Sequence, residues 1–322
     1  SDLALVASPA PAPTVSAPAP TEPTQTPLWA LLDGVEQVMP GTTKELRSAL
    51  ITVAEPIKPN QEEEDYGDYS GEDNSDNPAY FKGLLIGQAG TGKTYTLKER
   101  IKENPKYGLL CATTGIAAVN LSTADCVVRT IHSVLGFYDL NSMTQAYQRG
   151  RLTGALVRVA QQANRLIVDE MSMMGKRMFE VLQFALDDVN AYKGVQERGG
   201  LGLMLVGDFL QLPPVDDAYV FESDGFAPYE SNIEKLTKVY RQSDPTFLAA
   251  LQAARCGDGE TMVQALYSHP DVKFANQLDD NFDGTTIVAT NEEVNRLNNI
   301  RLMNLKNAGK KGFTVAATRW GK

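Results

Sequence analysis

Residues 87–94 read Gly-Gln-Ala-Gly-Thr-Gly-Lys-Thr, which matches the pattern GxxxxGK[ST]. This feature constrains the fold most strongly, because it works as a turn between a strand and a helix. An apolar run at 84–86 precedes it, and a helical pattern at 95–102 follows it. Glycines let the backbone wrap around phosphate oxygens, so that amide N–H groups and the helix N-terminus face the anion. The segment therefore predicts a loop that binds the phosphates of a nucleotide.

Two side chains of this loop have expected chemical roles. Lys93 reaches the β- and γ-phosphates, and the Thr94 hydroxyl ligates Mg²⁺. The alternative is a chance glycine-rich turn, which would have to fall by accident between a strand and a helix. The residues expected to bind the nucleotide are Gly87, Gln88, Ala89, Gly90, Thr91, Gly92, Lys93, Thr94 and Tyr95.

Nucleotide hydrolysis needs a carboxylate site as well as a phosphate loop. The apolar run at 166–168 ends in Asp169 and Glu170, so a buried strand delivers two acids at its carboxyl end. Asp169 is expected to hold Mg²⁺, and Glu170 is expected to polarise the attacking water as general base. Adjacent acids at a strand end can be incidental, but their position downstream of a phosphate loop favours the catalytic interpretation.

Short apolar runs separated by helical patterns recur after residue 80. Such runs indicate strands of a mostly parallel sheet with helices on both faces, which is the α/β fold class. Ligands bind at the carboxyl ends of the strands in these sheets, and the motifs above lie there. The expected strands are 83–87, 107–113, 164–170, 201–208 and 285–290.

The acidic character of the chain belongs to its N-terminal quarter. The formal charge is −10, with 40 acidic and 30 basic residues. Of these, 14 acidic and 3 basic residues lie in residues 1–80, so the remaining body carries 26 acidic and 27 basic residues. A near-neutral body is compatible with a local groove that binds nucleic acid.

Residues 1–78 are expected to form an arm and a linker. Residues 1–27 hold seven of the 17 prolines and predict a disordered arm. Apolar spacing at 28–39 allows a short helix, and the acidic tract at 61–78 reads as a linker. A solvated spacer and a segment that docks a partner are both open interpretations of that tract.

Several classes of protein are excluded. No stretch approaches the ~18 consecutive apolar residues of a membrane-spanning helix, and the N-terminus does not read as a secretory signal. Cys111, Cys126 and Cys256 form no CxxC pair, which fits reduced thiols and predicts no metal site at the cysteines. We therefore expect no membrane partner and no secretion.

Five further motifs follow the phosphate loop. They are Ala112-Thr-Thr-Gly-Ile-Ala-Ala118, Thr130-Ile-His-Ser133, Asp169-Glu-Met-Ser-Met173, Gly207-Asp-Phe-Leu-Gln-Leu-Pro-Pro-Val215 and Leu236-Thr-Lys-Val-Tyr-Arg-Gln242. In this order they resemble the superfamily 1B DNA helicases, the group that includes RecD, phage Dda and the eukaryotic PIF helicases. The resemblance covers about residues 83–305 and implies a RecA-like P-loop NTPase that uses ATP and Mg²⁺.

The resemblance also implies further catalytic residues beside Lys93 and Glu170. Gln211 resembles the family's γ-phosphate sensor, because an amide can hydrogen-bond both water and phosphate. Arg241 resembles the arginine that meets the γ-phosphate from the second motor domain. An ordinary surface or interdomain salt bridge is the alternative for Arg241.

Single-stranded DNA is the partner that the resemblance implies. Thr113, Thr114 and Gly115 resemble a segment that holds the DNA backbone, and an N-cap of the helix at 116–121 is a compatible second role. His132 lies where the family approaches the strand, although a structural histidine is the alternative. Phe209 is a candidate for stacking on a base, but isolated aromatic residues more often belong to a core.

The family comparison predicts one complete motor domain, at 79–232, and a truncated second motor domain, at 233–322. The segment at 290–298 resembles the opening of that second domain, and a strand is possible at 312–317. The glutamine-bearing segment that reads adenine in the family has no convincing counterpart in the acidic tract.

Two functions remain open at this stage. The first is a monomeric ATP-dependent 5′-to-3′ DNA helicase for replication, recombination or repair, in a bacterial or phage-infected cytoplasm or another DNA-containing compartment. The second is a non-motor nucleotide-binding module that recruits replication proteins through residues 1–78.

Overall fold

The computed structural model describes residues 39–50, 55–56, 81–123, 126–275, 282 and 284–313. They fall in two compact units, one within residues 1–268 and one within residues 269–322, and each unit is described by itself. The expected arm at 1–27, the expected helix at 28–39 apart from Met39, and the acidic tract at 61–78 lie outside the described residues.

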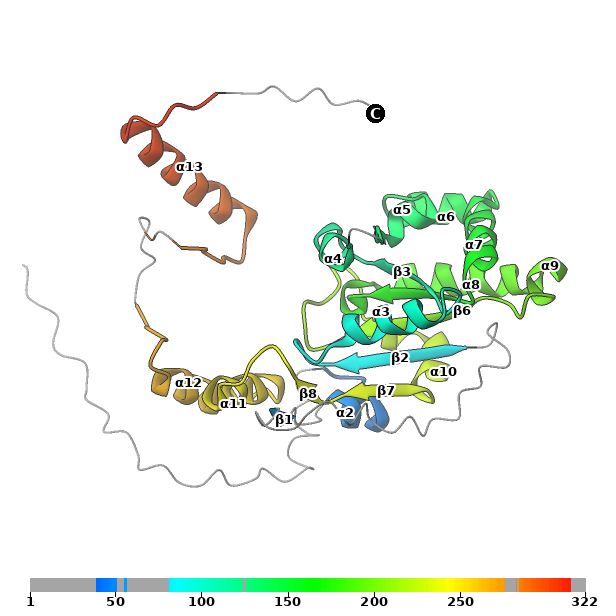
Figure 1. Cartoon of the computed structure of the whole chain (residues 1–322), viewed down its shortest axis with the longest axis horizontal. Helices are drawn as coiled ribbons and strands as arrows, with labels where there is room; N and C mark the ends of the chain where they lie inside the picture. Colours follow the sequence, from blue (N-terminus) through cyan, green and yellow to red (C-terminus); the bar gives the residue numbers. More distant parts are fainter. Residues whose placement is uncertain are drawn as a thin grey trace, which may run out of the picture. The chain divides into compact units, whose positions relative to one another are not determined.

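A six-stranded sheet organises the first unit (Figure 1). The strand order is β4-β3-β5-β6-β2-β7, and all neighbouring strands run parallel. Four of the strands are apolar runs expected from the sequence, so the predicted α/β class is confirmed. The strands are β2 (Lys82–Gly87), β3 (Leu109–Ala112), β4 (Arg129–Thr130), β5 (Arg165–Asp169), β6 (Gly202–Gly207) and β7 (Ile233–Leu236).

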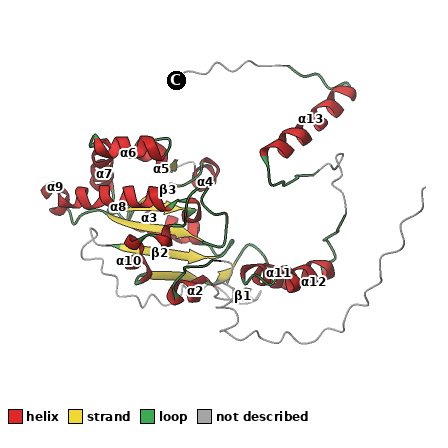
Figure 2. Ribbon diagram, turned by 180° about the vertical axis from the view of Figure 1, so that it is seen from behind, coloured by secondary structure: helices red, strands yellow, loops and turns green. Residues whose placement is uncertain are grey.

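Helices cover both faces of this sheet (Figure 2). Successive strand side chains point to opposite faces, so Leu84 and Ile86 enter one apolar core while Leu85 enters the other. The smaller core is lined by α3 (Lys93–Glu103) and α4 (Gly115–Leu121). The larger core is lined by α2 (Lys44–Leu50), α5 (Ile131–Leu135), α6 (Leu140–Gln148), α7 (Arg151–Gln162), α8 (Lys176–Ala191), α9 (Lys193–Gln196) and α10 (Ala227–Glu230).

The connections in this unit include short 3₁₀ turns at Met171–Met173, Val220–Glu222 and Asp224–Phe226. Across the part of the chain that the structure describes, no helix has the length and apolar character needed to cross a membrane.

Strand β7 lies beyond the domain boundary expected from the sequence. Residues 233–236 pair with residues 84–87 of β2, so the sheet extends past residue 232. In the sequence Ile-Glu-Lys-Leu two charged residues stand between two apolar residues, so the strand is not an apolar run. This pattern suits an edge strand, which needs charges to discourage pairing with other chains.

Two helices follow the sheet within the same unit. Strand β8 (Lys238–Val239) pairs with β1 (Glu55–Pro56), and the chain then enters α11 (Pro245–Arg255) and α12 (Gly259–Ser268). Asp244 caps α11 by accepting from the Phe247 N–H at 2.7 Å, and Pro245 occupies the first helical position. Both features fix the start of the helix.

The second unit contains α13 (Asn291–Asn307), which begins at its N-cap Thr290. The strand expected at 285–290 does not form, and Ile287 is 92% exposed. A parallel strand needs a neighbour to satisfy its backbone groups, and the described residues of 269–322 contain no other strand. Residues 312–313 are not a strand, and the rest of the strand expected at 312–317 lies outside the described residues.

Candidate nucleotide site

The phosphate loop joins β2 to α3, and two of its glycines have left-handed backbone conformations. Gly90 and Gly92 have φ angles of +85° and +86°, which glycine adopts without steric cost. Gly92 is also the N-cap of α3, so the helix N-terminus opens onto the loop. Thr91 closes the loop by donating from its hydroxyl to the Gln88 carbonyl at 2.9 Å. This geometry suits a bound anion.

The Lys93 side chain folds into the loop and faces acidic residues. Its ammonium group donates to the Gly87 carbonyl at 2.5 Å. Burial lowers the pKa of Lys93, while the negative charges of Asp208, Asp169 and Glu170 oppose that shift. The loop therefore contains a cation whose present partners are carbonyl oxygens that a phosphate can replace.

Thr94 and Asp169 bring the loop together with the carboxyl end of β5. The Thr94 hydroxyl donates to Asp169 Oδ2 at 3.4 Å, and Asp169 is only 5% exposed. Burial raises the pKa of Asp169, and the Glu170 N–H, the Lys93 charge and the Thr94 hydroxyl oppose the shift. The two residues predicted to hold Mg²⁺ are therefore neighbours in space.

Glu170 has a strained backbone at the end of β5. Its φ is +56°, in the left-handed region, which costs free energy for a residue other than glycine. Its N–H donates to Asp169 Oδ1 at 2.8 Å, and its carbonyl accepts from the Thr113 hydroxyl at 2.9 Å. Burial and the Asp169 charge raise the pKa of Glu170, against the effect of Lys93 and Arg241. Strain of this kind is characteristic of functional sites.

Arg241 lies directly against the phosphate loop. The N–H of its neighbour Tyr240 donates to the Gly90 carbonyl at 2.8 Å. A Cβ atom at Gly90 would come within 2.6 Å of Arg241 Cβ, so only glycine allows this approach. Arg241 is exposed and forms no ion pair with another described residue, which leaves its guanidinium available to an anion.

Gln211 lies in a turn that begins at Asp208, directly after β6. The Gln211 N–H donates to the Asp208 carbonyl at 3.0 Å, and the Asp208 carboxylate accepts from Arg255 at 2.5 Å. Sequence reasoning did not assign a role to Asp208 or Arg255. Asp208 has the signal of an acid at the end of an apolar strand, as Asp169 does, whereas Arg255 reads as an ordinary basic residue in the last turn of a helix.

Comparison with known proteins assigns the family. The family model described as PIF1-like helicase matches residues 74–245, more than half of the 322-residue chain. This chain belongs to the PIF1-like helicase family.

Curated PIF1-like relatives align with part of their length. The human ATP-dependent DNA helicase PIF1 is 34% identical over 209 residues, which cover 59% of this chain and 31% of that protein. The Saccharomyces cerevisiae protein of the same name is 31% identical over 236 residues, which cover 69% of this chain and 26% of that protein. The chain therefore spans about a third or less of these relatives.

The fold is that of a solved PIF1-like structure. The crystal structure of Pif1 helicase from Candida albicans superposes with a TM-score of 0.50 at 24% identity, over 70% of this chain and 52% of that chain. This likeness supports the RecA-like class that the sequence predicts.

The residues predicted to touch DNA occupy different environments in this PIF1-like domain. Thr114 caps α4 by accepting from the Ala117 N–H at 3.2 Å, so the N-cap interpretation is confirmed. Gly115 is exposed, and His132 is half-buried with its ring centroid 4.7 Å from that of Phe137. The DNA contacts of Thr113, Thr114, Gly115 and His132 stay predictions.

Phe209 is a correction. Its side chain is fully buried, and its ring meets those of Tyr219, Phe221 and Phe226 edge-on at 5.2 to 6.5 Å. With 0% exposure the ring offers no face to a base. The prediction that Phe209 stacks on DNA is therefore wrong, and Phe209 belongs to the PIF1-like core.

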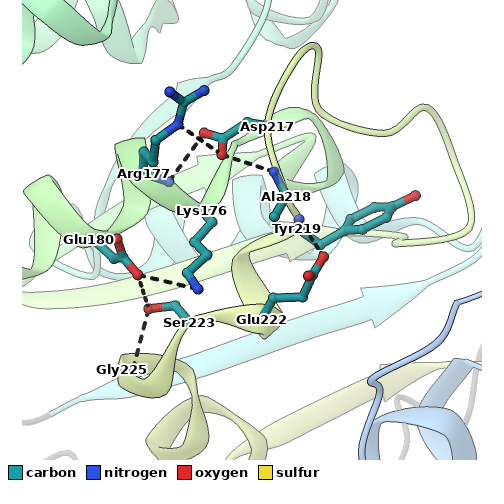
Figure 3. A network of polar contacts seen from close by, with 9 residues as sticks. All are labelled: Lys176, Arg177, Glu180, Asp217, Ala218, Tyr219, Glu222, Ser223 and Gly225. Atoms are coloured by element: carbon teal, nitrogen blue, oxygen red, sulfur yellow. Dashed lines mark hydrogen bonds and ion pairs between the residues drawn. The ribbon is translucent and has the colours of Figure 1, made fainter.

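The loop after Gln211 is anchored to the start of α8 (Figure 3). Asp217 accepts from the Arg177 N–H and Nε, each at 3.2 Å, and Lys176 N–H donates to the Ala218 carbonyl at 2.8 Å. The N-cap residue Gly175 has no side chain to cap α8. Asp217 therefore caps this helix from another segment, and it bonds the loop to α8.

Proposed function

We propose that this chain is the nucleotide-binding motor portion of an ATP-dependent DNA helicase. One observation carries the proposal: the phosphate loop, a pair of carboxylates and an arginine converge at one edge of the sheet, through Lys93, Glu170 and Arg241. These are the parts that transfer of a phosphoryl group to water requires. The human and yeast relatives are named ATP-dependent DNA helicases.

ATP and Mg²⁺ fit the residues of this edge. Thr94 Oγ1 and Asp169 Oδ2 are 3.4 Å apart, so both oxygens can ligate one cation directly or through water. No cluster of three or more His, Cys, Asp or Glu side chains among the described residues could hold a metal. A magnesium ion on a nucleotide needs only one or two carboxylates beside the phosphates. Mg²⁺ bound here would neutralise charge on the β- and γ-phosphates.

The side chains at this edge divide the work of hydrolysis. Glu170 takes the proton of the attacking water, and its raised pKa makes it a better base near neutral pH. Lys93 holds the phosphates, and Arg241 stabilises the charge that develops on the γ-phosphate. Gln211 contacts the γ-phosphate and the water, so its hydrogen bonds change when the phosphate leaves.

Single-stranded DNA runs, in this proposal, over Thr113 to Gly115 and past His132. The Thr113 hydroxyl donates to the Glu170 carbonyl, so the segment that holds DNA is bonded to the residue that activates water. A displacement of Glu170 during hydrolysis would therefore displace Thr113, and a displacement of Thr113 would displace Glu170. This hydrogen bond gives a direct route from hydrolysis to movement along the DNA strand.

The remaining expectations rest on the family. Translocation runs 5′ to 3′, the protein acts as a monomer in a DNA-containing compartment, and residues 233–322 belong to a second motor domain. The recruitment of replication proteins by residues 1–78 is proposed on a different ground, the proline-rich and acidic composition of that segment.

ATP hydrolysis by this chain, measured with and without single-stranded DNA, tests the proposal. Lys93→Ala should abolish hydrolysis and Lys102→Ala, an exposed lysine of the same helix, should leave it unchanged. Nucleotide binding without any hydrolysis or DNA stimulation would instead indicate a non-motor module.

A further inference from the structure

Arg255 is a buried cation near the nucleotide site that the proposed reaction does not use. It lies in the last turn of α11, and its side chain is 11% exposed. Its guanidinium donates to Asp208 Oδ2 at 2.5 Å and to the Leu50 carbonyl, at the end of α2, at 2.8 Å. One planar group thus joins three elements, α11, α2 and the end of β6.

Asp208 uses its other polar atoms to shape a turn. Oδ1 accepts from the Leu210 N–H at 3.2 Å, and the backbone carbonyl accepts from the Gln211 N–H at 3.0 Å. The side chain is 1% exposed. Because a buried carboxylate without a partner is costly, the orientation of Asp208 depends on the Arg255 fork.

The two sets of contacts form one chain of hydrogen bonds from α11 to Gln211. Arg255 fixes one carboxylate oxygen of Asp208, the other oxygen fixes the turn, and the turn fixes the backbone of Gln211. Arg255 does not touch the phosphate loop through any of these bonds. The hydrogen bonds of Arg255 therefore lead to the γ-phosphate sensor, while its link to Lys93 of the phosphate loop is through charge alone.

We propose that Arg255 is a positioning residue that holds Gln211 in place through Asp208, and so sets the preference of the site for ATP over ADP. The inference rests on the proposed function, in which Gln211 contacts the γ-phosphate. Loss of Arg255 loosens the turn at 208–211 and weakens the contact made only by a nucleotide with a γ-phosphate.

The experiment compares the affinities of AMP-PNP and ADP for the chain carrying Arg255→Gln, using fluorescent derivatives of both nucleotides. We expect about tenfold weaker binding of AMP-PNP, as for loss of one hydrogen bond to a charged group, with ADP affinity within about twofold of the unchanged chain. Arg158→Gln is the matched control, because Arg158 is an exposed helical arginine on α7. It should change neither affinity.

A second variant guards against a purely structural loss. In Asp208→Asn/Arg255→Gln two neutral amides can bond each other, and Asn still offers an oxygen to the Leu210 N–H. This double variant should recover part of the AMP-PNP affinity that Arg255→Gln alone loses. Retained ADP binding in all variants shows that the site is folded.

The outcomes separate this inference from the proposed function. If Arg255→Gln loses affinity for AMP-PNP and ADP equally, or loses none, the role of Arg255 is overturned. ATP hydrolysis by the unchanged chain would still uphold the proposed function. Absence of hydrolysis in the unchanged chain, with Lys93→Ala indistinguishable from it, defeats the proposed function itself.

Discussion

The two ends of the parallel sheet use buried charge in opposite ways. At the carboxyl end, Asp169, Glu170 and Lys93 lie close together, and burial shifts the pKa of each toward its neutral form. At the amino end, the Arg165 guanidinium lies over the rings of Phe81 and Tyr107, 4.2 and 4.6 Å from their centroids. One end keeps charges poised for a ligand, and the other satisfies them internally.

Arg100 extends the satisfied arrangement at the amino end. Its two terminal nitrogens donate to the two carboxylate oxygens of Glu234 at 2.7 and 2.5 Å. This bidentate pair joins α3 to the edge strand β7. The comparison teaches that substitutions of Lys93, Asp169 or Glu170 should affect chemistry without loss of stability. Substitutions of Arg165 or Arg100 at the amino end should do the reverse.

Glu170→Gln is expected to show the largest effect. Loss of the general base should slow ATP hydrolysis by about 10²- to 10⁴-fold. The pKa of Glu170 is higher in the folded than in the unfolded chain, so its ionisation at neutral pH opposes folding. The variant should therefore have an equal or higher free energy of unfolding, measured by urea denaturation. A clear loss of stability would contradict the comparison.

Phe209→Ala tests whether proximity to the site makes a residue functional. Phe209 follows Asp208 in the chain but is fully buried, so its removal should lower the free energy of unfolding by about 3–5 kcal/mol. Urea denaturation measures this loss. Phe209→Leu is the control, because it keeps most of the apolar volume, and DNA affinity should persist in it. Weak DNA binding by a stable Phe209→Leu variant would restore the stacking role.

The sequence predicted the carboxyl end of the sheet well, because its motifs are local. The loop at 87–94 and the acids at 169–170 each follow an apolar run that is itself a strand, so both the element and its position can be read within ten residues. Arg255 could not be found in this way. Its partner Asp208 lies 47 residues away, and only the packing of α11 brings the two together.

The errors share a physical cause, which is that burial and pairing depend on distant segments. Residues 285–290 have strand composition but no neighbouring strand among the described residues of their unit. Residues 233–236 have a composition that only weakly favours a strand, but they pair with β2. Phe209 follows a strand end yet turns into a ring cluster contributed by residues 219–226. Composition alone does not distinguish these cases.

Arg165→Ala removes the cation that packs on aromatic rings at the amino end of the sheet. The variant loses two cation–π contacts and the packing of a side chain whose residue is 6% exposed. We expect the free energy of unfolding to fall by about 2–3 kcal/mol, measured by urea denaturation. The KM for ATP should stay unchanged, because Arg165 begins β5 and the site lies at its other end. A rise in KM would show that the two ends are coupled.

Asp217→Ala should give the smallest effect, and it tests whether a carboxylate outside the site stabilises the fold. Asp217 caps α8 from a separate segment and is 14% exposed. Loss of a cap costs about 1 kcal/mol, so the thermal midpoint should fall slightly, as differential scanning calorimetry would measure. Asp216→Ala is unsuitable as a control, because Asp216 has a φ of +53°. Asp224→Ala is better, because Asp224 is an exposed carboxylate in the nearby 3₁₀ turn Asp224–Phe226. Asp217 and Glu170 are both carboxylates, so opposite effects of their substitution on the free energy of unfolding would have to come from their surroundings. Asp217 accepts from the N-terminus of a helix, whereas Glu170 lies beside the buried carboxylate of Asp169.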